Sequence, residues 1–209
     1  TRENRCVEYI MGAAMMEPDI RIETNRLGFC TDHFEMMLGQ KNRLSLALML
    51  ESHLQELRKG KYKDIVLKAE AKPRKRAEMG TVNDSCFVCS QIESAMDGML
   101  NTVMKQWERD ADFRKLFGEQ EYICLPHAEK LLTVAHDTLG RKEYPPFKEL
   151  VLSLLDKHLE SVGADVSHFC KMFDYRNAGP NADWGNSRNS IERAILALST
   201  RDFRSGGEQ

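Results

Sequence analysis

Cysteine and histidine are the residue types in this sequence whose spacing points most clearly to chemistry. One pair of cysteines forms a CxxC motif, Cys86-Phe87-Val88-Cys89, and a third cysteine forms a CxxH motif, Cys124-Leu125-Pro126-His127. A CxxC turn lets two thiolates approach one ion, and residues three apart at a helix start share one face. Three thiolates and one imidazole make a closed tetrahedral structural zinc site. The sequence therefore predicts a metal site formed by Cys86, Cys89, Cys124 and His127.

A second CxxH motif, Cys30-Thr31-Asp32-His33, lies earlier in the chain. Each CxxH is followed by a similar stretch, Leu50-Glu51-Ser52-His53-Leu54 in one case and Leu155-Asp156-Lys157-His158-Leu159 in the other. Two matching landmarks in one order indicate an internal duplication. Carrying the CxxC spacing back to the first copy places its CxxC upstream of Thr1. We therefore expect a truncated start and a first site that keeps only Cys30 and His33 as metal ligands.

Other uses of these side chains stay open. Cysteine and histidine ligands also hold iron–sulfur clusters, and Cys86 and Cys89 without a metal would form a dithiol–disulfide couple. The couple would leave Cys124 and His127 without a role, and the βαβ pattern of thioredoxin-like proteins is missing. Zinc is therefore the expected cofactor, with an iron–sulfur cluster as the alternative.

The elements that must position these ligands are predicted to be helices. Apolar residues from Ile92 to Trp107 recur at i, i+3, i+4 and i+7, as in an amphipathic helix. A second helix is expected from Pro126 to about Gly140, and a third through Leu150 and Leu159. Strand-like alternation is absent. The predicted fold is all-α, with two repeated three-helix units, each organised around a CxxC…CxxH metal site, and a C-terminal aromatic tail and helix.

The chain is expected to divide into four segments. They are a first helical unit (1–60), a basic linker (61–82), a second helical unit with the complete metal site (83–165), and a tail with a last helix (166–209) that runs from Ser190 to Ser199. The linker contains Lys72-Pro73-Arg74-Lys75-Arg76. Because no aromatic residues are interleaved with these charges, a solvated linker is favoured over a nucleic-acid surface.

Composition narrows the class of protein. The chain is 42% apolar and 30% charged, with a net charge of -2, which is ordinary for a soluble globular protein and gives no general attraction to nucleic acid or anionic membranes. No apolar run approaches the roughly 18 residues of a membrane span, and the charged start is unlike a signal peptide. We expect a cytoplasmic protein whose partner is another protein or a small ligand, with nucleic acid disfavoured and no membrane.

Two further clusters and two cysteines allow two interpretations each. The segment Met16-Glu17-Pro18-Asp19-Ile20-Arg21 is either a carboxylate pair with an arginine that line a pocket, or a helix end at Pro18 with a surface ion pair. Asp174-Tyr175-Arg176-Asn177, with Trp184 and Arg193, reads as a ligand site or as a tail that packs onto the helices. Cys6 and Cys170 fit core packing better than metal ligation. Phosphate loops and nucleophile elbows are absent, so no catalytic residue is named and enzymatic activity stays open.

These motifs together resemble a family of proteins. MEPDIR, GFCTDH, NRLSLALMLESHL, CFVC, YICLPH and KMFDYRN with Trp184 are similar to a bacterial family found in anaerobic Firmicutes, number 6062 among the domains of unknown function. The resemblance spans nearly the whole chain. It implies a CPxC motif just ahead of the segment matching Glu3 to Gly12, which this chain lacks, and it implies no activity. The leading hypothesis is a structural metal-binding module or adaptor; the alternative is a redox protein or metalloenzyme that uses an iron–sulfur cluster or reactive thiolates.

Overall fold

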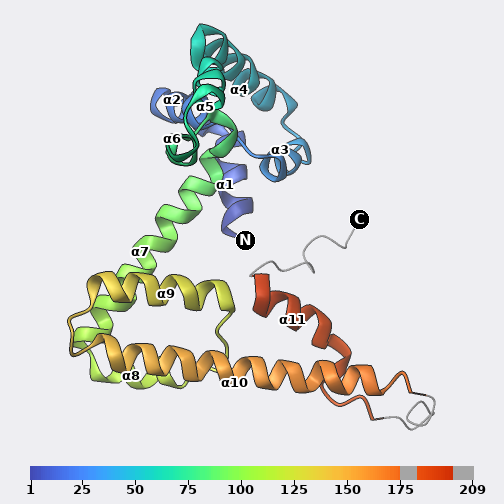
Figure 1. Cartoon of the computed structure of the whole chain (residues 1–209). Coiled ribbons are helices and arrows are strands. Elements are labelled where there is room, and N and C mark those ends of the chain that lie inside the picture. Colours follow the sequence, from blue (N-terminus) through green and yellow to red (C-terminus); the bar gives the residue numbers. More distant parts are fainter. Residues whose placement is uncertain (175–182, 200–209) are drawn as a thin grey trace. The chain divides into compact units, whose positions relative to one another are not determined.

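The computed structural model describes residues 1–174 and 183–199, and every regular element in these residues is a helix (Figure 1). The predicted all-α fold class is confirmed. The chain forms two compact units, which we call unit 1 (Thr1–Asp97) and unit 2 (Gly98–Gln209). Among the described helices, none combines the length and the apolar character that a bilayer span requires.

Unit 1 is built from short helices around one core. Its elements are α1 (Arg2–Met11), α2 (Pro18–Leu27), α3 (Thr31–Leu38), α4 (Arg43–Glu56), α5 (Lys63–Glu70), α6 (Pro73–Glu78) and the start of α7 (Phe87–Arg109). The core gathers apolar side chains from α1, the short 3-10 turn after it, α3, α4 and the start of α7: Val7, Ile10, Met11, Met15, Met37, Leu46, Met49, Cys86, Phe87 and Val88. The beginning of α7 thus belongs to the same core as the N-terminal helices.

Local sequence signals explain where several of these helices begin and end. Thr1 Oγ1 accepts a hydrogen bond from the Asn4 backbone N–H, and Asn42 Oδ1 accepts one from Ser45 N–H; both are N-cap contacts. Pro18 occupies the first turn of α2, where its missing N–H costs nothing. Gly28 ends α2 with φ 63° and ψ -156°, a conformation that favours glycine.

Arg21 links α2 to α4 through hydrogen bonds within unit 1. Its guanidinium donates to Ser52 Oγ at 2.9 Å, to Leu48 O at 2.8 Å and to Met15 O at 3.2 Å. These contacts correct both interpretations of the Met16–Arg21 cluster. Pro18 begins a helix and does not end one. Among the described residues, Arg21 forms tertiary hydrogen bonds, and belongs neither to a surface ion pair nor to a ligand pocket.

The basic segment predicted as a linker contains helices α5 and α6. Neither helix has a buried residue, so the expectation of a solvated segment agrees with their exposure, whereas their helical structure was not anticipated. Lys68 forms a 2.6 Å ion pair with Asp84, and Arg76 donates to the carbonyl of Ala69 near the end of α5. These local contacts hold the segment without a hydrophobic core of its own.

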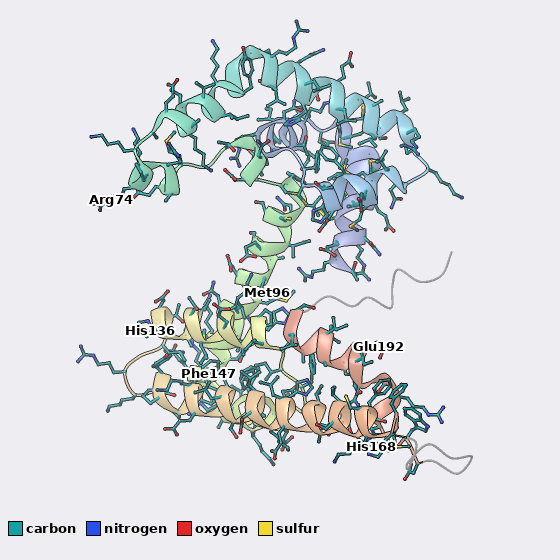
Figure 2. The ribbon with its side chains drawn as sticks, turned by 45° about the vertical axis from the view of Figure 1, so that its right-hand side comes forward. Arg74, Met96, His136, Phe147, His168 and Glu192 are labelled. Carbon is teal, nitrogen blue, oxygen red and sulfur yellow. The ribbon has the colours of Figure 1, made fainter. Side chains whose placement is uncertain are left out.

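Unit 2 consists of the rest of α7, α8 (Ala111–Gly118), α9 (Leu125–Thr138), α10 (Tyr144–Lys171) and α11 (Ser190–Ser199). Three aromatic rings pack together near its centre. Phe147 is fully buried and points from α10 into the helices of the unit (Figure 2), with its ring centroid 5.0 Å from that of Trp107 and 5.6 Å from that of Phe117. The helices α9, α10 and α11 also pack on one another.

The end of α10 and the start of α11 are held by side-chain contacts. Trp184 lies edge-on to Phe169 and Phe173, and Arg193 forms a 2.7 Å ion pair with Asp165. These contacts agree with a tail that packs onto the helices; Tyr175, Arg176 and Asn177 lie outside the described residues. Cys170 is exposed on α10, which corrects the expectation that it would be a core residue.

The observed units differ from the predicted segments. The division falls at Asp97, inside α7, whereas the sequence placed a second unit from residue 83. The difference has a physical cause, because residues 86–88 are buried in the core of unit 1. Within the described residues, the two repeated three-helix units are not confirmed.

Candidate metal centre

The first half of the site is the start of α3. Cys30 is the N-cap residue, in an extended conformation, and His33 lies in the first turn. This spacing brings Cys30 Sγ to 3.0 Å from His33 Nδ1. His33 is only 3% exposed, so its imidazole is held among neighbouring side chains instead of extending into solvent.

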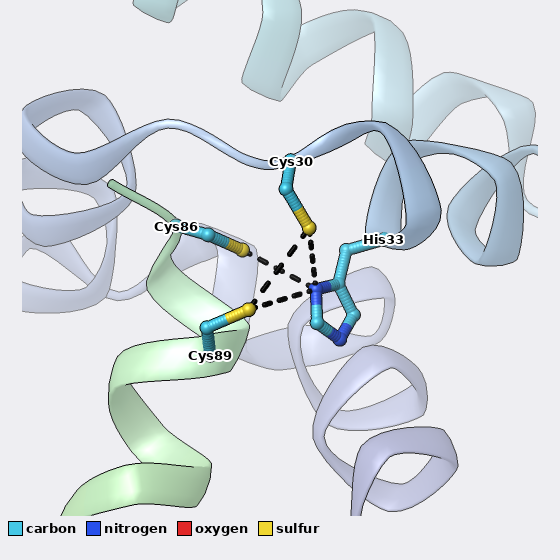
Figure 3. Close-up of side chains that lie close together, drawn as sticks. All are labelled: Cys30, His33, Cys86 and Cys89. Carbon is cyan, nitrogen blue, oxygen red and sulfur yellow. Dashed lines mark hydrogen bonds between the residues drawn. The ribbon is translucent and has the colours of Figure 1, made fainter. Parts of the chain in front are cut away.

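The second half of the site is the start of α7. Cys86 directly precedes the helix and its carbonyl accepts a hydrogen bond from Ser90 N–H, which places Cys89 in the first turn. Cys86 Sγ lies 3.3 Å and Cys89 Sγ 3.5 Å from His33 Nδ1, and Cys89 Sγ is 4.0 Å from Cys30 Sγ. Figure 3 shows the three sulfur atoms gathered on the Nδ1 side of the ring.

Backbone and aromatic contacts join the two helix starts. Phe87 N–H donates to Gly28 O at 2.9 Å, and Ser85 Oγ donates to Leu27 O at 2.7 Å. Phe29 packs edge-on against both Phe34 and Phe87. The two ligand pairs therefore meet because the segment before α3 and the segment before α7 are paired with each other.

The four side chains have the arrangement that a single ion requires. Among the described residues, they are the only group of three or more metal-type ligands whose donor atoms all lie within 4.8 Å of one another. In a tetrahedron with zinc bond lengths, sulfur atoms lie about 3.8 Å apart and each lies about 3.5 Å from the nitrogen. The distances of 4.0 Å between sulfurs and 3.0–3.5 Å from sulfur to nitrogen are close to these values. This group could hold a metal ion.

The electrostatics of the site disfavour free thiolates and favour a bound cation. Partial burial raises the pKa of Cys89 to about 12, and the adjacent Cys86 and Cys30 sulfurs add to the shift. Burial lowers the pKa of His33, an effect that the carboxylates of Glu3 and Asp32 partly offset. Sulfurs packed this closely repel one another as thiolates, and a divalent cation removes that repulsion.

The grouping of the candidate ligands differs from the one that the sequence predicts. Cys86 and Cys89 were assigned to Cys124 and His127, but the structure joins this CxxC to the first CxxH, Cys30 and His33. Four candidate ligands therefore lie together around the first CxxH, where the sequence predicts two. The pairing follows from the contacts of residues 85–87 with residues 27–29.

Cys124 and His127 form a separate pair in unit 2. Cys124 is the N-cap residue of α9, and its Sγ lies 3.1 Å from His127 Nδ1, so the pair repeats the local geometry of Cys30 and His33. Among the described residues, no group of three or more metal-type ligands includes this pair. A role of Cys124 and His127 as metal ligands stays a prediction.

The remaining histidines and cysteines have contacts away from the four ligands. His53 Nδ1 lies 3.0 Å from Asn25 O between α4 and α2, and His158 packs edge-on against Tyr122. Cys6 packs against the core of unit 1, as expected. One neighbour of the site was missed: the Glu3 carboxylate lies 3.8 Å from His33 Nε2, and no motif in the sequence connects these two residues.

Comparison with known proteins supplies the family. No curated protein and no solved structure matches the chain significantly. The model of one family, described as a family of unknown function (DUF6062), matches residues 1–204. This match covers the whole of unit 1 and both CxxH motifs. The chain therefore belongs to the DUF6062 family of unknown function.

Proposed function

We propose that the chain is a metal-binding protein in which Cys30, His33, Cys86 and Cys89 hold one structural zinc ion. The observation that carries the proposal is the convergence of four ligand atoms from two helix starts within 4.8 Å. Three thiolates and one imidazole fill the coordination sphere of zinc and leave no position for a water or substrate. Such an ion stabilises the fold without performing chemistry, since structural zinc sites contribute directly to folding free energy.

The same distances argue against an iron–sulfur cluster at this site. Two thiolates on one tetrahedral zinc ion lie about 3.8 Å apart, and the four donor atoms here all lie within 4.8 Å of one another. The protein ligands of a multinuclear cluster bind different iron atoms, so they must be spread more widely. A mononuclear ion therefore suits this group better.

A structural ion places the chain among binding or adaptor modules rather than metalloenzymes. A cavity of about 350 Å³ lies in unit 2, and its lining contains no cysteine or histidine: Val103, Phe113, Leu116, Phe117, Gln120, Tyr122, Ile123, Leu131 and Leu154. The proposed zinc ligands therefore do not line this cavity. We expect the partner to be a protein or a small ligand, and we place the protein in the cytoplasm, where thiolate ligands stay reduced.

Metal analysis of anaerobically purified protein tests this proposal. We expect zinc bound at this site, lost in the double variant Cys30→Ser/Cys89→Ser and retained in the control Cys170→Ser, which removes an exposed cysteine on α10. The variant Cys124→Ser/His127→Ala should keep one zinc per chain because the four proposed ligands are intact. Iron with sulfide, or zinc that remains when Cys30→Ser/Cys89→Ser is combined with Cys124→Ser/His127→Ala, would contradict the proposal.

A further inference from the structure

His33 faces the proposed ion through Nδ1. The three cysteine sulfurs lie 3.0, 3.3 and 3.5 Å from this nitrogen, whereas Nε2 is on the opposite side of the ring, pointing away from the sulfurs (Figure 3). A histidine that binds a metal through Nδ1 in its neutral form carries its proton on Nε2. Nε2–H is therefore a hydrogen-bond donor in the metal-bound site.

This donor lies in a buried position without a hydrogen-bond acceptor at bonding distance. Nε2 is shielded from solvent and has no hydrogen-bond partner. A buried donor left unsatisfied is unfavourable, and metal-ligating histidines nearly always donate their second N–H to a carboxylate, a carbonyl or water. The site thus requires an acceptor on the Nε2 side of His33.

Glu3 is placed to be that acceptor. Its Oε1 lies 3.8 Å from Nε2, and its side chain is half exposed, so a side-chain rotation can close the remaining distance without disturbing the core. The backbone of Glu3 is fixed, because α1 packs into the core of unit 1 through Val7 and Ile10. α1 also packs against α3, the helix that carries His33.

We propose that Glu3 is a positioning residue for the metal site, accepting a hydrogen bond from His33 Nε2–H. The carboxylate fixes the tautomer and orientation of the ring so that Nδ1 faces the ion, and it increases the basicity of the imidazole. This inference rests on the proposed function, and it assigns to α1 a part in metal binding although α1 supplies no ligand.

Two variants of Glu3 separate positioning from a general effect on α1. Glu3 lies in the first turn of α1, where its negative charge also interacts favourably with the helix dipole and stabilises the helix. Glu3→Gln and Glu3→Ala both remove that charge, but only Gln keeps an oxygen that can accept from Nε2–H, in a weaker hydrogen bond than the carboxylate makes. Glu8→Ala is the matched control, since Glu8 is an exposed glutamate on the same helix.

The experiment is a zinc competition titration of the full chain with a chromophoric chelator, carried out for wild type and the three variants. We expect Glu3→Ala to weaken zinc binding about tenfold, Glu3→Gln to be intermediate and Glu8→Ala to match wild type. The proton on His33 Nε2 should be visible by nuclear magnetic resonance in zinc-loaded wild type and exchange-broadened in Glu3→Ala. Equal affinities for wild type and Glu3→Ala would overturn the role of Glu3 alone. A wild type that binds no zinc would overturn the proposed function as well.

Discussion

Each CxxC or CxxH motif lies at the beginning of a helix. Cys30 and Cys124 are N-cap residues with His33 and His127 in the first turns, and Cys86 directly precedes α7. At a helix start the backbone N–H groups and the dipole favour negative charge, which suits thiolates bound to a cation. The motif spacing therefore places two ligands on one face of the helix start, where the electrostatic field of the helix dipole stabilises thiolates.

Zinc binding at this site should strengthen as pH rises. The pKa of Cys89 in the metal-free chain is about 12, so this thiol is protonated at neutral pH and zinc must displace its proton. Each proton released makes the apparent affinity about tenfold higher per pH unit. Chelator competition at pH 6, 7 and 8 measures this slope, with the chelator's own pH dependence subtracted. An affinity that does not change with pH would contradict thiolate ligation.

The residues of the site could be predicted from sequence, but their partnership could not. CxxC and CxxH identify cysteine and histidine ligands by local spacing alone, whereas the choice between Cys30–His33 and Cys124–His127 depends on contacts distant in sequence. Loop length offers little help, since doubling a loop costs only about 0.6 kcal/mol in closure entropy. Packing of Phe87 against Phe29 decides the pairing, and apolar residues of that kind carry no distinguishing pattern in sequence.

At the scale of elements, the segment before α3 determines whether the two ligand pairs can meet. Gly28 ends α2 with a positive φ and offers its carbonyl to Phe87 N–H. Side chains other than glycine rarely adopt this backbone conformation. The turn at Gly28 is therefore required both to start α3 in the right direction and to hold the first residue of α7.

Replacing Gly28 should weaken unit 1. We expect Gly28→Ala to lower the free energy of unfolding by about 1–3 kcal/mol because of backbone strain, and to weaken zinc binding because the carbonyl that holds Phe87 is displaced. Urea unfolding followed by circular dichroism measures the first effect and chelator competition the second.

Gly80→Ala is the control for this substitution, since a methyl group there would meet no atom within 4 Å and φ is not positive. It should change neither quantity appreciably. If Gly28→Ala behaved like Gly80→Ala, the turn would not be needed for the site.

Helices were predicted correctly where the apolar periodicity extends over several turns, and they were missed where the helix is short. The predicted helices from Ile92 to Trp107 and from Pro126 to about Gly140 correspond to α7 and α9, and Ser190–Ser199 is α11. Helices α5 and α8 are only eight residues long and contain no fully buried residue. Each is shorter than the window over which apolar periodicity identifies a helix in sequence. The role of Arg21 was missed because its acceptors are largely backbone carbonyls of α4 and the preceding turn, which sequence does not mark.

At the scale of the whole molecule, the site belongs to one unit only. All four ligands lie within Thr1–Asp97. One of them, Cys86, is itself part of the unit 1 core together with its neighbours Phe87 and Val88. Unit 2 has its own aromatic core around Phe147. Loss of the ion should therefore affect the two units differently.

The two tryptophans allow this difference to be measured, because Trp107 and Trp184 both lie in unit 2. We expect a zinc chelator to reduce the helical signal in circular dichroism, as unit 1 loses the ion that joins α3 to α7, while tryptophan emission stays unchanged. The variant Cys30→Ser/Cys89→Ser should show the reduced signal before chelator is added. A shift of tryptophan emission in parallel with the loss of helix would contradict a site confined to unit 1.

X-ray absorption spectroscopy of the zinc-loaded chain tests the central claim most directly. The variant Cys124→Ser/His127→Ala is the sample to use, because it leaves only the four proposed ligands to bind zinc. We predict a first shell of three sulfur atoms at about 2.3 Å and one nitrogen atom at about 2.0 Å, with the scattering pattern of an imidazole. A shell with oxygen ligands, or with fewer than three sulfurs, would contradict a closed site made by Cys30, His33, Cys86 and Cys89.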